Sequence, residues 1–189
     1  MNKFVYASAL GASTLALAAC GSDETASVSA ANANPITAEE VEAAQKAWGE
    51  GIVTIGQTFT DEGDYRQTAT DHINTHYAYG DDATVLFKPT LAAEDQFREN
   101  FDEALSYFVG KEGTEDGGFA IAPFTAVRWE NNGTVIDPDG DMAVAMGNYY
   151  FTGTDGSETK VEYSFAYEKD DAGDLKIVLH HSSLPFSAN

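Results

Sequence analysis

Cysteine is almost absent from this chain, since Cys20 is the only one among 189 residues. A disulfide framework and a thiolate metal site are therefore both excluded. Basic residues are also few: 10 Lys and Arg stand against 31 Asp and Glu, and the formal net charge is −21. This acidity argues against nucleic acid and against an anionic membrane surface as partners.

Long apolar runs are missing beyond residue 19, so nothing there predicts a membrane span. The sequence also lacks internal repeats, a glycine-rich phosphate loop and a Ser-His-Asp order typical of a catalytic triad. Enzymes that depend on those motifs are not indicated. A catalytic site, if present, has to be built from other side chains.

The N-terminus has the pattern of a bacterial lipoprotein. Lys3 precedes an apolar stretch to residue 19, and residues 17–20 (LAAC) form a processing box. We expect cleavage before Cys20 and lipidation of its thiol. Gly21, rather than Asp, after the cysteine favours the outer membrane, facing the periplasm of a Gram-negative cell. Lipid on Cys20 is the only membrane attachment expected.

The chain then divides into two parts. Residues 20–34 are the lipidated cysteine followed by small polar residues, which predicts a flexible tether. Residues 35–189 are long enough for a single domain with a hydrophobic core.

The first half of this domain has helical periodicity. Thr37 and Glu40 form a capping box, and apolar residues recur at helical spacing to about Phe59, with glycines that make a kink plausible. A second helix is predicted over 64–77, a short strand over 83–87, and a third helix over 91–109 with Phe97 and Phe101 in its apolar stripe.

The second half changes to strand periodicity. Runs at 120–129, 142–152, 160–168 and 175–183 are separated by short turn sequences, which predicts an antiparallel meander. Helices followed by such a meander indicate an α+β domain, in which a curved, mostly antiparallel sheet wraps around helices to form a cone.

Residues 180–183 (HHSS) end the last predicted strand and are the strongest candidate for chemistry. Side chains on a strand alternate between its faces. Because Leu175, Ile177 and Leu179 are expected inside, the alternation places His181 and Ser183 inward. His180 and Ser182 are then expected outward, unless a bulge inverts the order. Either way, the adjacent histidines cannot bind one metal ion together.

Other candidates have simpler explanations. His72 and His76 are four residues apart on a predicted helix, but no zinc-protease pattern surrounds them. Residues 137–141 (DPDGD) lack the glycine and glutamate positions of a calcium loop, which favours a solvated turn. Thr90 could be a helix N-cap and Tyr107 a boundary tyrosine, or both could serve a site.

Five segments, taken in order, resemble the iota-class carbonic anhydrases, which are related to the association domain of calcium/calmodulin-dependent kinase. They are 85–90 (VLFKPT), 106–110 (SYFVG), 145–151 (AMGNYYF), 161–163 (VEY) and 180–183 (HHSS). The resemblance covers about residues 38–186. It implies a cone-shaped α+β fold like that of nuclear transport factor two, usually a dimer, and reversible hydration of carbon dioxide to bicarbonate.

The resemblance also implies the site. The family's threonine corresponds to Thr90, its tyrosine to Tyr107, and its serine to Ser182 or Ser183, with strand parity favouring Ser183. We expect Thr90, Tyr107, Ser183 and His181 to be catalytic. Ser182 and His180 are expected to assist in binding substrate, and Phe97 and Phe101 to form a wall for carbon dioxide.

Some family members use zinc or manganese and others use no metal. Leu179 replaces the first histidine of a triple-histidine form, and the chain offers no cysteine ligand cluster, so a metal-free site is expected here. The alternative function is a non-catalytic domain of the same fold that binds a small ligand or serves oligomerisation.

Overall fold

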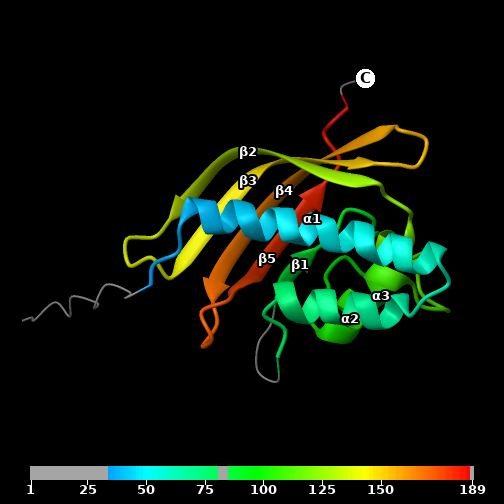
Figure 1. Ribbon diagram of the computed structural model, residues 1–189, viewed down its shortest axis with the longest axis horizontal. Coiled ribbons are helices and arrows are strands. Elements are labelled where there is room, and N and C mark those ends of the chain that lie inside the picture. The colour runs from blue at the N-terminus through cyan, green and yellow to red at the C-terminus, as the bar shows by residue number, and fades with distance from the viewer. Residues whose placement is uncertain (1–33, 81–84, 188–189) are drawn as a thin grey trace, which may run out of the picture.

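In the computed structural model, a single five-stranded sheet is covered on one face by helices (Figure 1). The structure describes residues 34–80 and 85–187. The predicted signal segment, Cys20 and most of the predicted tether lie outside these residues. The elements are α1 (Ala38–Thr60), α2 (Tyr65–His76), β1 (Leu86–Lys88), α3 (Phe101–Val109), the 3₁₀ turn η1 (Phe119–Ile121), β2 (Ala126–Ile136), β3 (Met142–Thr152), β4 (Glu158–Lys169) and β5 (Leu175–Ser183).

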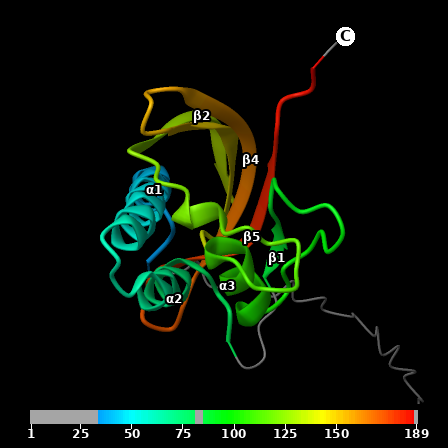
Figure 2. The same cartoon turned by 90° about the vertical axis from the view of Figure 1, so that its right-hand side faces the viewer.

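The sheet confirms the predicted meander. Its strand order is β1-β5-β4-β3-β2, with antiparallel pairing from β2 through β5, and β1 runs parallel to β5 at the edge. Seen end-on, the sheet curves around α1, with α2 and α3 below it (Figure 2). The helices therefore fill the concave side of an α+β cone, as expected.

The first strand of the predicted meander, over 120–129, was placed too early. Residues 119–121 form a 3₁₀ turn, and β2 continues through Asn132 and Gly133, where a turn was expected. A register shift between Asn131 and Gly133 absorbs the extra residue as a bulge. The bulge packs closely on Gly147, where an added Cβ would lie 2.3 Å from the Glu130 carbonyl oxygen.

Helix α1 begins as predicted. Thr37 accepts a hydrogen bond from the Glu40 amide, and Glu40 accepts one from the Thr37 amide. The helix runs unbroken for 23 residues through its glycines. These glycines serve close packing: a Cβ on Gly51 would lie 2.1 Å from His72 Nδ1, and one on Gly49 would lie 3.0 Å from Val127 Cβ.

Helix α3 begins ten residues later than predicted. Asn100 is its N-cap and accepts a hydrogen bond from the Glu103 amide, so Thr90 does not cap it. Residues 91–100 form an irregular segment instead. The Glu115 carboxylate accepts hydrogen bonds from the amides of three consecutive residues there: Ala93, Glu94 and Asp95.

Arg98 fixes the same segment from inside. Its guanidinium is buried and lies 2.7 Å from Asp116, whose other oxygen accepts from Ser106 at 2.5 Å. A charge buried in this way is stable only because it is paired. Residues 91–100 are therefore held by these polar pairs and do not form the first half of the helix that hydrophobic periodicity predicted.

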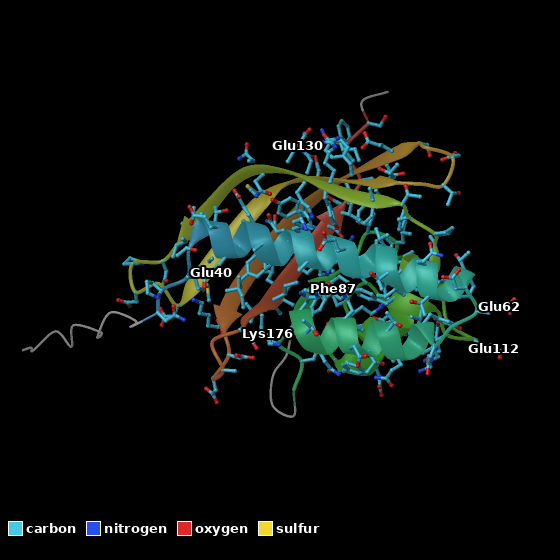
Figure 3. The ribbon with its side chains drawn as sticks, in the orientation of Figure 1. Glu40, Glu62, Phe87, Glu112, Glu130 and Lys176 are labelled. Atoms are coloured by element: carbon cyan, nitrogen blue, oxygen red, sulfur yellow. The ribbon has the colours of Figure 1, made fainter. Side chains whose placement is uncertain are left out.

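Aromatic side chains fill the space between the helices and the concave face of the sheet. Trp48, Phe87, Phe108 and Phe165 are almost completely buried, and Figure 3 shows Phe87 in this interior, with charged residues such as Glu62 and Glu112 at the periphery. Among the described residues, no helix has both the length and the apolar character needed to cross a bilayer.

Candidate active site

A cavity of about 180 Å³ opens within the aromatic core, between α1, α3, β1 and the concave face of the sheet. Its polar lining consists of five hydrogen-bonding side chains from α3, β3, β5 and the segment after β1, together with Thr159. The rest of the wall is aromatic or aliphatic. The five polar residues are Thr90, Tyr107, Tyr149, His180 and Ser182.

Thr90 and Ser182 meet because β1 runs parallel to β5. Phe87 is paired with His180 and Lys88 with His181, so the residues that follow these positions stay side by side. The Thr90 and Ser182 hydroxyl oxygens lie 2.9 Å apart, within hydrogen-bond distance. Residues 92 positions apart in the sequence thus form one hydroxyl pair in the cavity.

Tyr107 projects into the cavity from α3. Its hydroxyl oxygen accepts a hydrogen bond from the Leu91 amide at 3.4 Å. Burial raises the pKa of this hydroxyl well above its usual value, although the Leu91 amide and the Arg98 guanidinium oppose the shift. Tyr107 is therefore protonated and available as a hydrogen-bond donor throughout the physiological range.

The predicted parity of the His-His-Ser-Ser segment is wrong. His180 and Ser182 are buried, with exposed fractions of 2% and 4%, while His181 is exposed and Ser183 lies on the outer face. The register explains the inversion: Ile177 pairs with Tyr167 and Leu179 with Ala166, so Val178 is an extra residue in β5. A bulge of one residue exchanges the two faces of all that follows.

His180 is held firmly in the interior. Its ring stacks on Phe87 at 4.6 Å between centroids and meets the edge of Phe165 at 4.1 Å. Nδ1 lies 2.8 Å from the Tyr77 hydroxyl, and Nε2 lies 3.4 Å from the Tyr149 hydroxyl. Burial, followed by the nearby His181, holds the pKa of His180 well below its usual range, so the ring is neutral.

Tyr149 and Trp48 were missed as site residues. Tyr149 follows Ala143 and Ala145 on the buried face of β3, and burial raises the pKa of its hydroxyl so that it too stays protonated. Strand alternation through 143–151 was the signal that could have found it. Trp48 lies on the apolar face of α1 and lines the cavity.

The predicted carbon dioxide wall is also misplaced. Phe97 is 57% exposed, and neither Phe97 nor Phe101 is among the lining residues. Phe97 lies in the first half of the predicted helix over 91–109, which does not form, whereas Phe101 begins α3 and packs against the core without lining the cavity. The apolar wall is made of other residues, among them Phe119, Phe124, Phe151, Val161 and Leu184.

No cluster of metal ligands lines the cavity in the described part of the chain. Within the described residues, the group of three side chains close enough to hold a metal ion together is Asp137, Asp139 and Asp141. These residues lie in the β2–β3 turn, away from the cavity. The His72 and His76 rings on α2 are tilted against each other with 4.6 Å between centroids, and His72 is buried against Trp48 and Phe108. Neither of these histidines lines the cavity.

Comparison of the sequence with known proteins identifies one family. A family model described as metal-independent carbonic anhydrase matches residues 39–184. A metal-independent carbonic anhydrase from Nostoc sp. (strain PCC 7120 / SAG 25.82 / UTEX 2576) is 43% identical over 155 residues, which cover 80% of this chain and 75% of the relative.

Two solved structures resemble the fold. A cyanobacterial iota-carbonic anhydrase, complexed with bicarbonate, aligns with a TM-score of 0.77 and 39% identity, covering 82% of this chain and 96% of that one. A Xanthomonas campestris protein described as a calcium/calmodulin-dependent protein kinase II association domain aligns with a TM-score of 0.53 and 24% identity, covering 84% and 95%. The second likeness concerns the fold alone, and both agree with the predicted α+β cone.

Proposed function

We propose that the cavity lined by Thr90, Tyr107 and Ser182 is the active site of this chain, which belongs to the metal-independent carbonic anhydrases of the iota class. These enzymes interconvert carbon dioxide and bicarbonate without a metal cofactor. The observation that carries this proposal is the convergence of neutral hydrogen-bond donors in one mostly apolar cavity. The cyanobacterial relative's complex with bicarbonate supports the same ligand here.

In the proposed mechanism, the hydroxyls stabilise negative charge as it develops on the carbonate oxygens. Donors fixed in a cavity of low polarity need little reorganisation during the reaction, which lowers the barrier. Burial keeps Tyr107 and Tyr149 protonated and His180 neutral, so the donors persist across working pH. The apolar wall around Phe119 and Phe151 accepts carbon dioxide, which carries no net charge.

The attacking water must lose a proton as it bonds to the carbon atom. No carboxylate is present among the described lining residues. In the proposal, Thr90 and Ser182, whose oxygens are 2.9 Å apart, orient this water and pass its proton towards solvent. Hydration then yields bicarbonate and one released proton.

Carbon dioxide hydration by the purified protein tests this function. We expect equal rates before and after treatment with a strong chelator, and a large loss of kcat/KM in Tyr107→Phe, which keeps the ring but removes the donor. A wild-type protein without activity would overturn the functional proposal. Activity lost only after chelation would overturn the metal-free mechanism.

We also propose that the protein forms a homodimer through the outer face of the sheet. Met142, Val144 and Met146 alternate with buried alanines on β3 and are 40–52% exposed, and Leu86 at the sheet edge is 62% exposed. Exposed apolar patches of this kind mark interfaces, and in a twofold dimer the same face of a second copy would cover this one. Sedimentation of wild type and Met146→Glu tests this: we expect a dimer and a monomer, whereas a monomeric wild type would contradict the proposal.

The N-terminal motif supports a proposed location. Lipid on Cys20 would attach the enzyme to the outer membrane, facing the periplasm, as the LAAC box and Gly21 indicate. Expression in a Gram-negative host with a labelled fatty acid tests this proposal. Labelled protein in the outer-membrane fraction is expected, with Cys20→Ala unlabelled; label absent from the wild type, or present in Cys20→Ala, would contradict it.

A further inference from the structure

We propose that Trp48 and Tyr77 act as positioning residues that fix the tautomer of His180, so that its Nε2 carries the proton and donates a hydrogen bond into the cavity. This inference rests on the proposed function for its catalytic consequence. The tautomer itself follows from geometry alone.

Trp48 determines how the Tyr77 hydroxyl is used. An indole N–H can only donate a hydrogen bond. Trp48 Nε1 lies 3.0 Å from the Tyr77 hydroxyl oxygen, so that oxygen is the acceptor. Both side chains are almost completely buried, with exposed fractions of 1% and 2%.

The Tyr77 hydroxyl must then donate its own proton to another acceptor. Among the described residues, the acceptor within reach of the Tyr77 hydroxyl is His180 Nδ1, at 2.8 Å. If Nδ1 carried a proton, both groups would donate to the tyrosine oxygen, and the Tyr77 O–H would remain buried without an acceptor. An unsatisfied buried donor is costly, so Tyr77 donates and Nδ1 is unprotonated.

A neutral imidazole with an unprotonated Nδ1 carries its proton on Nε2. Its neutrality follows from the surroundings: Phe87, Phe165 and Tyr77 pack on the ring, and burial disfavours the charged form. His180 lines the cavity, and among the described residues the hydrogen-bond contact of its Nε2 is a long one, 3.4 Å, with the Tyr149 hydroxyl. That N–H is therefore available to donate to a carbonate oxygen when substrate is bound.

The chemical consequence is that His180 acts as a donor and not as the base that deprotonates water. A base would need a free lone pair at Nε2, and the Trp48–Tyr77–His180 series places a proton there. The series also holds the ring in orientation, because hydrogen bonding at Nδ1 fixes one axis while Phe87 stacks on its face.

Nuclear magnetic resonance of protein labelled with ¹⁵N-histidine reads the tautomer directly. The His180→Gln spectrum assigns the signal among the four histidines. We expect the Nε2–H pattern in wild type and its loss or mixing in Tyr77→Phe and in Trp48→Phe. Trp129→Phe is the matched control, because the Trp129 Nε1 donor is buried without a hydrogen-bond partner among the described residues, and its spectrum should match the wild type.

Kinetics complete the test. We expect kcat/KM to fall by about tenfold in Tyr77→Phe, the factor that one net hydrogen bond represents, with Trp129→Phe unchanged. An Nδ1–H pattern in wild type would overturn the proposal, and so would an unchanged pattern in Trp48→Phe, which keeps Tyr77 even if Tyr77→Phe fails to fold. An inactive wild type with the Nε2–H pattern would instead overturn the proposed function and leave the tautomer assignment intact.

Discussion

Ser182 and Ser183 are adjacent hydroxyls that lie on opposite faces of β5. Ser182 lies in the cavity beside Thr90, whereas Ser183 is within 3.3 Å of Glu162 on the outer face. The two serines have the same chemistry and nearly the same position in the sequence. They therefore separate the effect of the cavity from the effect of the residue type.

We predict that Ser182→Ala lowers kcat/KM for carbon dioxide by about 100-fold, because loss of one preorganised donor typically costs that much. Ser183→Ala should leave kcat/KM unchanged. Stopped-flow hydration assays of the two variants check this. Equal losses in both, or a loss only in Ser183→Ala, would show that the cavity is not the catalytic site.

At the scale of elements, α1 and α2 pack closely because Gly51 has no side chain. The position of its absent Cβ lies 2.1 Å from Nδ1 and 2.6 Å from Cε1 of His72. His72 is buried and packs in turn against Trp48, which lines the cavity. The glycine thus sets the distance between two helices that support the site.

We predict that Gly51→Ala lowers the free energy of unfolding by about 1–3 kcal/mol, the usual cost of overpacking, although alanine favours a helix by about 1 kcal/mol. Urea denaturation measures the change. Gly80→Ala is the control, because none of the described residues lies within 4 Å of the added Cβ there. A more stable Gly51→Ala protein would show that His72 moves aside at little cost.

The irregular segment 91–100 is a second element-scale feature, and Glu115 is its main anchor. Three backbone amides donate to this carboxylate, and these bonds hold the pKa of Glu115 below its usual value. The segment begins at Leu91, which lines the cavity and whose amide bonds Tyr107. The anchor therefore supports one wall of the site.

We predict that Glu115→Gln speeds hydrogen exchange at the amides of Ala93, Glu94 and Asp95, because a neutral amide oxygen accepts less strongly than a carboxylate. It should also lower kcat/KM severalfold through Leu91 and Tyr107. Glu112→Gln is the matched control, since Glu112 is exposed (Figure 3). Unchanged exchange in Glu115→Gln would mean that the segment is held by Arg98 alone.

At the scale of the whole molecule, two buried histidines, His72 and His180, and the half-buried His76 are held in a neutral form. Burial lowers the pKa of His76 to about 4, helped by nearby Lys176, and holds those of His72 and His180 well below their usual range. In the unfolded chain the same imidazoles bind protons near pH 6.5. Between these values the unfolded state binds more protons, so acidification favours unfolding.

We predict that the free energy of unfolding is maintained above pH 6.5 and falls progressively as the pH is lowered towards 4. His76 alone should contribute about 2 kcal/mol of this loss between pH 7 and pH 5. Urea titrations at the two pH values check this. His76→Gln should lose that part of the pH dependence, whereas exposed His181→Gln should retain it; equal slopes in all three proteins would contradict the assignment.

The sequence by itself determined the capped first helix, the four-stranded meander with the bounds of the strands over 142–152 and 175–183, the α+β class and the family. These depend on local patterns: a capping box, alternation of side chains, short turns and segments in a fixed order. It also identified the His-His-Ser-Ser segment, because four polar residues end an apolar strand, and it identified Thr90 and Tyr107 through the family resemblance.

Only the tertiary structure decided which of those residues share the cavity. The bulge at Val178 moved His180 and Ser182 inward, and it arises from pairing with β4, which no pattern within 175–183 reveals. The buried Arg98 and its acidic partners likewise replaced a predicted helix with an irregular segment and removed Phe97 from the site. Periodicity reports which side chains are apolar, whereas register and buried charge pairing depend on residues distant in the chain.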